Sequence, residues 1–174
     1  MTDVFEESLE LRARDEPFVL ATVVAYKSPQ SAKPGSRAII KSDGSISGLV
    51  GGGCVQPIVL REAQQALKTG QPKLLTISPD ASHADDWKGV ESYRMTCEGG
   101  GSLEIYLEPF LPKPELMIVG DSPVAQTIAQ LGELLDFKVI NDPTQIKEAT
   151  YVVVATMGNG DEEGLLSVPT IQPK

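Results

Sequence analysis

Hydrophobic and polar positions along the first 110 residues fall into short runs that are typical of β-strands. Apolar and β-branched stretches bounded by Pro, Gly, Ser and Asp predict strands at Phe18–Tyr26, Arg37–Lys41, Ser45–Val50, Lys73–Ser78 and Ser102–Pro109. In the last of these, Leu and Ile alternate with Glu and Tyr, which is the period of a strand with one buried face. This part of the chain is therefore predicted to be rich in β-structure.

Two segments in the same region have helical spacing instead. Asp3–Arg14 has acids early and arginines late, as the helix dipole favours, and Val4, Phe5, Leu9 and Leu11 make an apolar stripe along it. Ile58–Lys68 places its apolar residues on one side, and Gly70 follows as a C-terminal stop. Asp43-Gly44 supplies the positive φ that a tight hairpin turn requires. The segment is thus an α/β domain rather than an all-β one.

From residue 115 onward, strands alternate with helices. Glu115–Gly120, Phe137–Ile140 and Tyr151–Thr156 read as buried strands, with a helix over Pro123–Leu135 between the first two. That order predicts a parallel βαβ unit. The predicted fold class is therefore α/β: a β-rich N-terminal α/β domain at 1–110, a proline-rich linker at 111–114, and a small, incomplete Rossmann-like parallel βαβ unit at 115–174. A half-sheet with exposed edges must pack on a partner, and a homodimer is the simplest arrangement.

Composition narrows the class of function. A net charge of −9 over 174 residues argues against nucleic-acid binding, which needs clustered Lys and Arg. No apolar run is long enough to predict a membrane span, and the acidic N-terminus is unlike a secretory signal, so we expect a cytoplasmic protein. In that compartment the 2 cysteines are expected to be reduced. With a single histidine they do not provide a structural zinc set.

Both cysteines lie in glycine-rich loops. Gly51, Gly52, Gly53 and Cys54 follow an apolar run and precede the second predicted helix. Such a loop can gather amide N–H groups around an anion or a thiolate. The alternative is a tight turn in which the cysteine packs as a small hydrophobe. The theme recurs where Cys97 and Glu98 precede Gly99, Gly100 and Gly101.

The order of these motifs resembles a known family. Its elements here are Thr22-Val23-Val24, Ser28-Pro29, Lys33-Pro34-Gly35-Ser36, Asp43-Gly44, Gly51-Gly52-Gly53-Cys54-Val55, Cys97 with its glycines, and Leu107-Glu108-Pro109. The pattern is similar to that of the XdhC/CoxI family, the accessory proteins of xanthine dehydrogenase and molybdenum carbon-monoxide dehydrogenase. The later part resembles the family's Rossmann-like half in shortened form.

The resemblance implies that the chain binds molybdenum cofactor (molybdopterin) and delivers it to a molybdenum hydroxylase, in some members alongside a sulfurtransferase. It implies a chaperone more than an enzyme. The cofactor-binding residues it places in this chain are Gly51, Gly52, Gly53, Cys54, Cys97, Gly99 and Gly100, with Cys54 as the residue that contacts molybdenum. We add Arg37 as a candidate for the cofactor phosphate. Gln56 stands where the family usually has an acid.

Other functions stay open at this stage. Gly120, Ser122 and the acid Asp142 occupy positions of a dinucleotide fingerprint, which makes NAD(P) a candidate cofactor and an oxidoreductase a candidate activity. The fingerprint is degenerate, because Ser122 replaces its middle glycine and Asp121 places a negative charge beside the phosphates. A thiol-based sulfur carrier and a ligand-free structural or regulatory module are the remaining alternatives.

Overall fold

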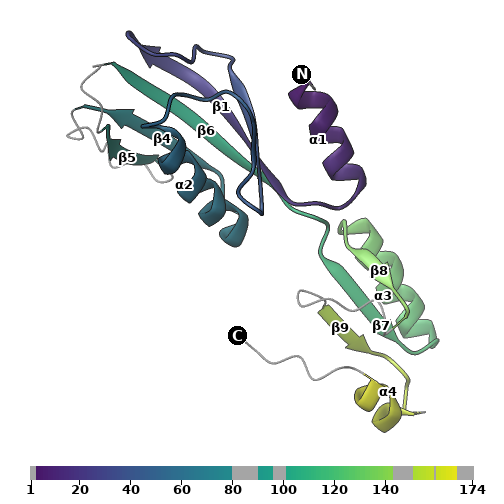
Figure 1. The fold of residues 1–174 in the computed structure, drawn as a ribbon. Helices are drawn as coiled ribbons and strands as arrows, with labels where there is room; N and C mark the ends of the chain where they lie inside the picture. The colour runs from purple at the N-terminus through teal and green to yellow at the C-terminus, as the bar shows by residue number, and fades with distance from the viewer. Residues whose placement is uncertain (1–2, 80–89, 96–100, 143–150, 159, 168–174) are drawn as a thin grey trace. The chain divides into compact units, whose positions relative to one another are not determined.

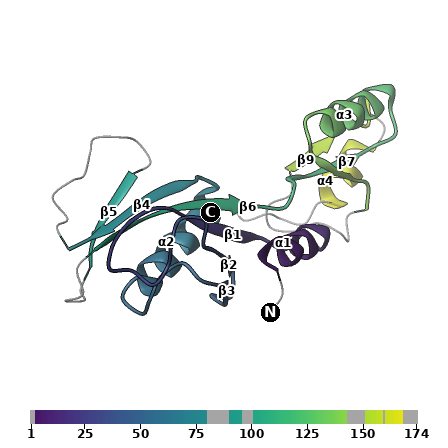
Figure 2. The ribbon, with the colours of Figure 1, turned by 90° about the horizontal axis from the view of Figure 1, so that it is seen from above.

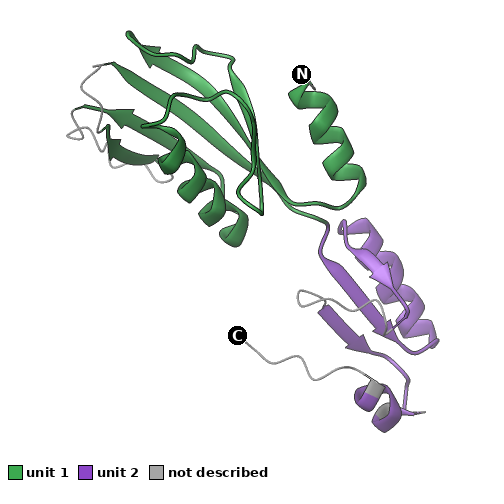
Figure 3. Ribbon diagram, viewed as in Figure 1, with its two compact units in different colours: residues 1–112 green, residues 113–174 purple. Residues whose placement is uncertain are grey.

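A computed structural model describes residues 3–79, 90–95, 101–142, 151–158 and 160–167. The chain divides into two compact units, residues 1–112 and 113–174 (Figure 3). The elements of the first unit are α1 (Val4–Ala13), β1 (Phe18–Lys27), β2 (Arg37–Lys41), β3 (Ile46–Gly48), α2 (Gln56–Thr69), β4 (Lys73–Ser78), β5 (Val90–Arg94) and β6 (Ser102–Phe110). Those of the second unit are β7 (Glu115–Val119), α3 (Pro123–Leu134), β8 (Lys138–Ile140), β9 (Tyr151–Val154) and α4 (Asp161–Ser167).

The strands of the first unit form one 6-stranded sheet in the order β3-β2-β1-β6-β4-β5 (Figure 1). Neighbouring strands are antiparallel except for β4 and β5, which run parallel. A register shift between Val23 and Ala25 marks a bulge in β1 opposite β6. The sheet therefore places β1 and β6 at its centre, with α2 packed across β1, β6 and β4 (Figure 2).

The two faces of this sheet bury different residues because successive side chains of a strand point in opposite directions. Val19 and Ile40 belong to the large core under α2. Their neighbours Phe18 and Ile39 pack on the other face, with Leu11 of α1. Each of these side chains is almost fully buried, and burial of an aliphatic or aromatic side chain of this size stabilises the fold by about 2 kcal/mol.

Helix α1 begins with Asp3 as its N-cap, whose Oδ1 accepts a hydrogen bond from the Phe5 amide at 2.9 Å. The predicted apolar stripe along this helix is covered only in part. Only Leu11 is buried, while Phe5 is 52% and Leu9 is 67% exposed. The helix also contacts the sheet through polar groups, because Oε1 of Glu7 lies 2.8 Å from Nζ of Lys41 on β2.

Helix α2 starts at Gln56, with Pro57 in its first turn, and ends at Gly70 in the left-handed conformation with φ 68°. The predicted glycine stop is confirmed. The buried side of the helix consists of Val59, Glu62, Ala63 and Ala66. Alanines there let the helix approach the sheet closely, and Glu62 is the one charged residue among them.

The second unit has a 3-stranded parallel sheet in the order β8-β7-β9. Its core joins Leu116 and Ile118 of β7 to Ala125 of α3. The predicted parallel βαβ unit is therefore confirmed, and so is the α/β fold class. The strand order reverses at β7, so the carboxyl ends of β7 and β9 border the crevice where doubly wound folds bind ligands.

Candidate functional site

The loop Gly51–Cys54 connects the β3 region to α2. Gly51 is buried with φ +146°, and a Cβ placed on it would lie 2.8 Å from Cβ of Val55. A side chain here would displace the start of α2, so this glycine is required by packing. Gly52 and Gly53 are exposed, and nothing lies within 4 Å of a Cβ built on Gly53. The outer part of the loop is thus open backbone.

Two other segments meet this loop at the same end of the sheet. A Cβ on Gly52 would lie 3.7 Å from Oγ of Ser31. A Cβ on Gly101 would lie 2.4 Å from the carbonyl oxygen of Lys27 and 2.8 Å from that of Pro29. The segment after β1, the glycine loop and the start of β6 therefore converge. The predicted site residues Cys97, Gly99 and Gly100 lie outside the described residues.

Two carboxamides lie in this cluster, and one of them, Gln30, was missed by the sequence analysis. Nε2 of Gln30 donates to Sδ of the buried Met95 over 3.6 Å. Nε2 of Gln56 donates to the carbonyl oxygen of Gly51 over 3.5 Å. Both distances are long for hydrogen bonds, and a thioether is a weak acceptor. Gln30 could not be found from sequence, because its contact residue is 65 positions away.

Cys54 is half-buried against the core under α2 and is disulfide-bonded. This corrects the expectation that Cys54 is a reduced thiol. In the disulfide the sulfur has no thiolate to offer to a metal. Coordination of molybdenum by Cys54 would therefore require prior reduction.

The start of α2 offers fewer amide groups than the glycine loop suggested. The amides of Val55 and Gln56 donate to the carbonyl oxygen of Gly52 at 2.9 and 3.1 Å. Pro57 has no N–H group. An anion at this helix start would have to use the amides of the loop itself.

The side chain of Arg37 does not reach the glycine loop. The guanidinium carbon of Arg37 lies 4.9 Å from the centroid of the Phe5 ring, on the face of the sheet that α1 covers. Alternation along β2 explains this, because Arg37 shares a face with Ile39 while Ala38 and Ile40 face α2. Arg37 is therefore removed from the candidate phosphate site.

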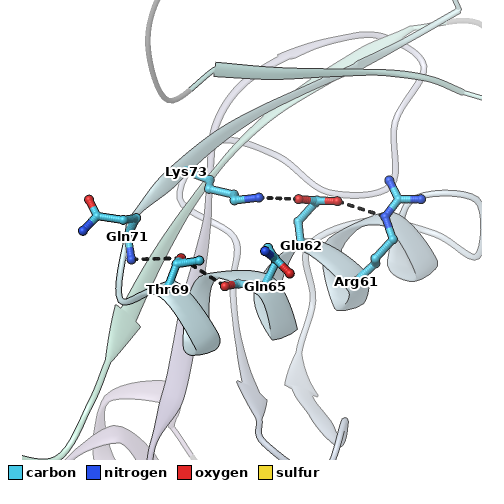
Figure 4. Close-up of polar contacts among 6 residues, drawn as sticks. All are labelled: Arg61, Glu62, Gln65, Thr69, Gln71 and Lys73. Atoms are coloured by element: carbon cyan, nitrogen blue, oxygen red, sulfur yellow. Dashed lines mark hydrogen bonds and ion pairs between the residues drawn. The ribbon is translucent and has the colours of Figure 1, made fainter. Parts of the chain in front are cut away.

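An ion cluster around the buried carboxylate of Glu62 holds α2 on the sheet (Figure 4). Oε2 of Glu62 lies 2.7 Å from Nζ of Lys73 on β4, and Oε1 lies 2.9 Å from Nε of Arg61. Burial opposes ionisation of Glu62, but hydrogen bonds with Lys73, Arg61 and Tyr93 outweigh it, and the pKa of the carboxyl is lowered. Burial and the bond to Glu62 raise the pKa of Tyr93 to about 12. The helix that carries the glycine loop is thus fixed to β4 and β5.

The end of the same helix is closed by hydroxyl bonds. Oγ1 of Thr69 donates to the carbonyl oxygen of Gln65 at 3.1 Å and accepts from the Gln71 amide at 3.3 Å (Figure 4). These contacts lead directly into β4. Both ends of α2 are therefore held, and only the outer glycines of its preceding loop are open.

In the second unit, the loop where a dinucleotide-binding fold would hold pyrophosphate is filled by protein atoms. Gly120 has φ +116°, and a Cβ on it would lie 2.6 Å from the carbonyl oxygen of Ala155. Ser122 is buried, and its Oγ donates to the same carbonyl at 2.5 Å and accepts from the Ala125 amide at 3.1 Å. This hydroxyl stands where a dinucleotide site has its middle glycine. Asp142 is exposed after β8. The residues present do not fit a pyrophosphate.

Beside this closed position, a cavity of about 380 Å³ opens at the end of β9. Its lining is mainly apolar and consists of Val154, Ala155, Thr156, Met157, Gly158 and Leu165. Among the described residues there is no group of three or more His, Cys, Asp and Glu side chains arranged to hold a metal ion. None of the described helices has the length and apolar character needed to cross a membrane.

Part of the first unit matches a known protein family. Residues 11–78 match the model of the XdhC and CoxI family. The matched segment runs from the end of α1 through β4 and includes the whole Gly51–Cys54 loop. The resemblance predicted from the motifs is therefore confirmed over this segment.

Two individual proteins are also similar. The uncharacterized protein YqeB of Escherichia coli (strain K12) is 27% identical over 137 residues, which is 79% of this chain and 24% of YqeB. The chain thus spans about a quarter of the length of that relative. A crystal structure of a xanthine dehydrogenase from Bacillus halodurans has a TM-score of 0.47 at 15% identity and covers 95% of this chain and 78% of its own.

Proposed function

We propose that this protein is an accessory protein of molybdenum enzymes that binds molybdenum cofactor and passes it to a molybdenum hydroxylase such as xanthine or CO dehydrogenase. The observation that carries the proposal is the family match across residues 11–78, which includes the convergent glycine loop. The protein is a chaperone in this account and catalyses no reaction of its own.

The residues of the loop fit such a cofactor when Cys54 is reduced. A thiolate is a soft ligand suited to molybdenum. Gly52 and Gly53 leave the backbone beside it open to close approach. When bound, the cofactor would provide the redox chemistry of the client enzyme, while this chain holds and orients it.

The disulfide at Cys54 makes binding depend on the redox state. In the cytoplasm thiols are kept reduced, and the proposed cytoplasmic location therefore suits the cofactor-binding form.

A homodimer is part of the proposal. At the end of α3 in the second unit, Leu131, Leu134 and the C-cap Leu135 are 52%, 82% and 70% exposed. Exposed apolar side chains grouped on one helix are typical of protein interfaces. Light scattering at several protein concentrations gives the oligomeric state.

A ligand-free structural module is a second candidate, because Cys54 is tied in a disulfide and packs against the core. In that case the glycine loop serves packing alone. Reduction would then change stability but create no affinity for the cofactor.

Delivery to a client tests the proposed function. A cofactor-free molybdenum hydroxylase is mixed under anaerobic, reducing conditions with cofactor, alone or preincubated with this protein. We expect faster and more complete activation with the protein, and no such gain with Cys54→Ser. The control is Gln65→Ala, an exposed change on α2. Equal activation with and without the wild-type protein would contradict the chaperone role.

A further inference from the structure

Within the described part of the chain, no strand pairs with the outer edge of β9, which is the last strand in the order β8-β7-β9. The amide of Ala155 donates to the carbonyl oxygen of Val119 on β7 at 2.8 Å. Because the backbone groups of successive strand residues point to opposite sides, the N–H and C=O groups of Val153 also face β7, and those of Val152 and Val154 point away from the sheet. β9 therefore presents two donors and two acceptors along one open edge.

The composition of β9 distinguishes it from the other described edge strands. β5 carries Glu91 and Arg94, and β8 carries Lys138, and charged side chains on an edge discourage pairing with another strand. β3 is only 3 residues long and ends at Gly48. The sequence of β9 is Tyr-Val-Val-Val, which has high strand propensity and neither a charge nor a proline. An open edge of this kind accepts another strand.

A second copy of β9 fits this edge when Val153 of both copies lies on a two-fold axis. In that antiparallel register Val152 of each copy lies opposite Val154 of the other. These are the residues whose backbone groups point outward, so the two copies exchange four hydrogen bonds. The side chains also stay on matching faces, because Val152 and Val154 both face the side of α4, where Cγ1 of Val154 lies 3.2 Å from a Cβ built on Gly164. A slip of one residue in the pairing would lose this match.

Exposed large apolar side chains flank the open edge on β9, in the loop after it and on α4. They are Tyr151, Met157, Leu165 and Leu166, which are 61%, 70%, 63% and 78% exposed. In the two-fold register Tyr151 of one copy lies opposite Ala155 of the other, a residue that lines the apolar cavity at the end of β9. The eight flanking side chains of two copies bring together an area on the order of 1,000 Å², which is what a specific interface needs.

Charge also favours a second copy at this edge. A net charge of −9 makes most surfaces of two copies repel each other, whereas the residues of the β9 register are uncharged, so no like charges oppose each other there. We propose that a second copy occupies the edge, and that the two 3-stranded sheets continue as one sheet through an antiparallel pair of β9 strands. The pairing rests on the homodimer of the proposed function and names the strand edge through which it forms.

Sedimentation velocity of the full chain over a range of concentrations tests this pairing by giving the dissociation constant of the dimer for each variant. Tyr151→Lys places a charge on the edge, and Val152→Pro removes an amide that points away from β7. Leu9→Lys is the matched control, because it changes the net charge by the same amount at a side chain that is 67% exposed on α1. Amide hydrogen exchange followed by NMR reports on Val152 and Val154 directly.

We expect a dimer whose dissociation constant rises by about tenfold or more in both edge variants, the loss expected when one hydrogen-bonded group is removed from each copy, and is unchanged in Leu9→Lys. The amides of Val152 and Val154 should gain protection as the wild-type concentration rises. A dimer that Leu134→Lys disrupts and the edge variants leave intact would overturn the β9 pairing while leaving the proposed homodimer.

Two further outcomes would contradict the pairing. A monomer at every concentration would overturn both the pairing and the homodimer, without affecting cofactor retention, which tests the proposed function separately. A monomer whose Val152 and Val154 amides gain protection only when a molybdenum hydroxylase is added would overturn the second copy and assign the edge to that partner.

Discussion

Oγ of Ser122 lies 2.5 Å from the carbonyl oxygen of Ala155 and joins the start of α3 to the end of β9. The same hydroxyl accepts from the Ala125 amide at 3.1 Å, so one buried group caps a helix and closes the crevice between two parallel strands. Dinucleotide-binding folds keep that crevice open for pyrophosphate. The second unit therefore has the strand order of a nucleotide-binding half without its phosphate position.

The closed crevice predicts that NAD⁺ and NADP⁺ do not bind. Titration calorimetry with either nucleotide at millimolar concentration should show no saturable heat. The degenerate fingerprint adds Asp121, whose charge would repel phosphate. Micromolar binding that ADP competes away would show that the hydroxyl does not block the site.

The Ser122 hydroxyl should also stabilise the fold. Ser122→Ala removes the helix cap and leaves the carbonyl of Ala155 without its donor, so the free energy of unfolding should fall by about 1–2 kcal/mol. Thr127→Ala is the control, because its exposed hydroxyl bonds only to the carbonyl of Pro123 on the same helix. Urea unfolding of both variants measures the difference. An equal loss of unfolding free energy in the two variants would show that the buried hydrogen bonds of Ser122 add no stability beyond that of an exposed hydroxyl.

Gly48 should be the least replaceable glycine of the loop region. It has φ +103°, and a Cβ on it would lie 2.4 Å from the carbonyl oxygen of Arg37. Gly48→Ala should lower the free energy of unfolding by about 2 kcal/mol or more, since strain and a backbone clash add. Gly53→Ala meets open space and should stay within about 1 kcal/mol of wild type. Thermal unfolding of both variants and of wild type measures the difference. A Gly48→Ala variant as stable as wild type would contradict the packing described for β2 and β3.

Glu62 should make the free energy of unfolding depend on pH in the acidic range. Its pKa is lowered from 4.5, so its ionised form contributes stability above pH 4.5, and that contribution is lost as the pH falls through the folded-state pKa. Glu62→Gln should cost about 2 kcal/mol at neutral pH, with the gap to wild type closing in acid. Glu10→Gln breaks an exposed pair with Arg14 and should change stability by less than about 0.5 kcal/mol. Urea unfolding across this pH range measures both, and a gap that does not change with pH would exclude the ion cluster as its source.

Much of the fold follows from local pattern. β2 and β4 have the predicted bounds, because their apolar runs end at strong turn or loop residues. β5 was not predicted, since Val90–Arg94 is mostly polar and becomes a strand through parallel pairing with β4. α4 was also missed, because its sequence begins with three consecutive acids and has only two large apolar residues, Leu165 and Leu166. For β5, tertiary pairing rather than intrinsic propensity decides the structure.

The candidate site was less predictable. The glycine loop and Cys54 were identified from the motif, but the placement of Arg37 depends on which face of β2 receives α1. The bond from Gln30 to Met95 joins residues that nothing in the local sequence links. Alternation along β2 was the one signal that could have excluded Arg37, because Ile39 shares its face.

Binding of molybdenum cofactor at the Gly51–Cys54 loop is tested most directly by anaerobic titration of the reduced protein with cofactor released from a donor enzyme, measuring molybdenum retained after gel filtration. Wild type should retain it stoichiometrically, Cys54→Ser should retain much less, and oxidation of the wild-type protein to its disulfide form should abolish retention. No retention by the reduced protein at micromolar concentration, with Cys54 shown to be a free thiol by alkylation, would contradict the cofactor-binding account.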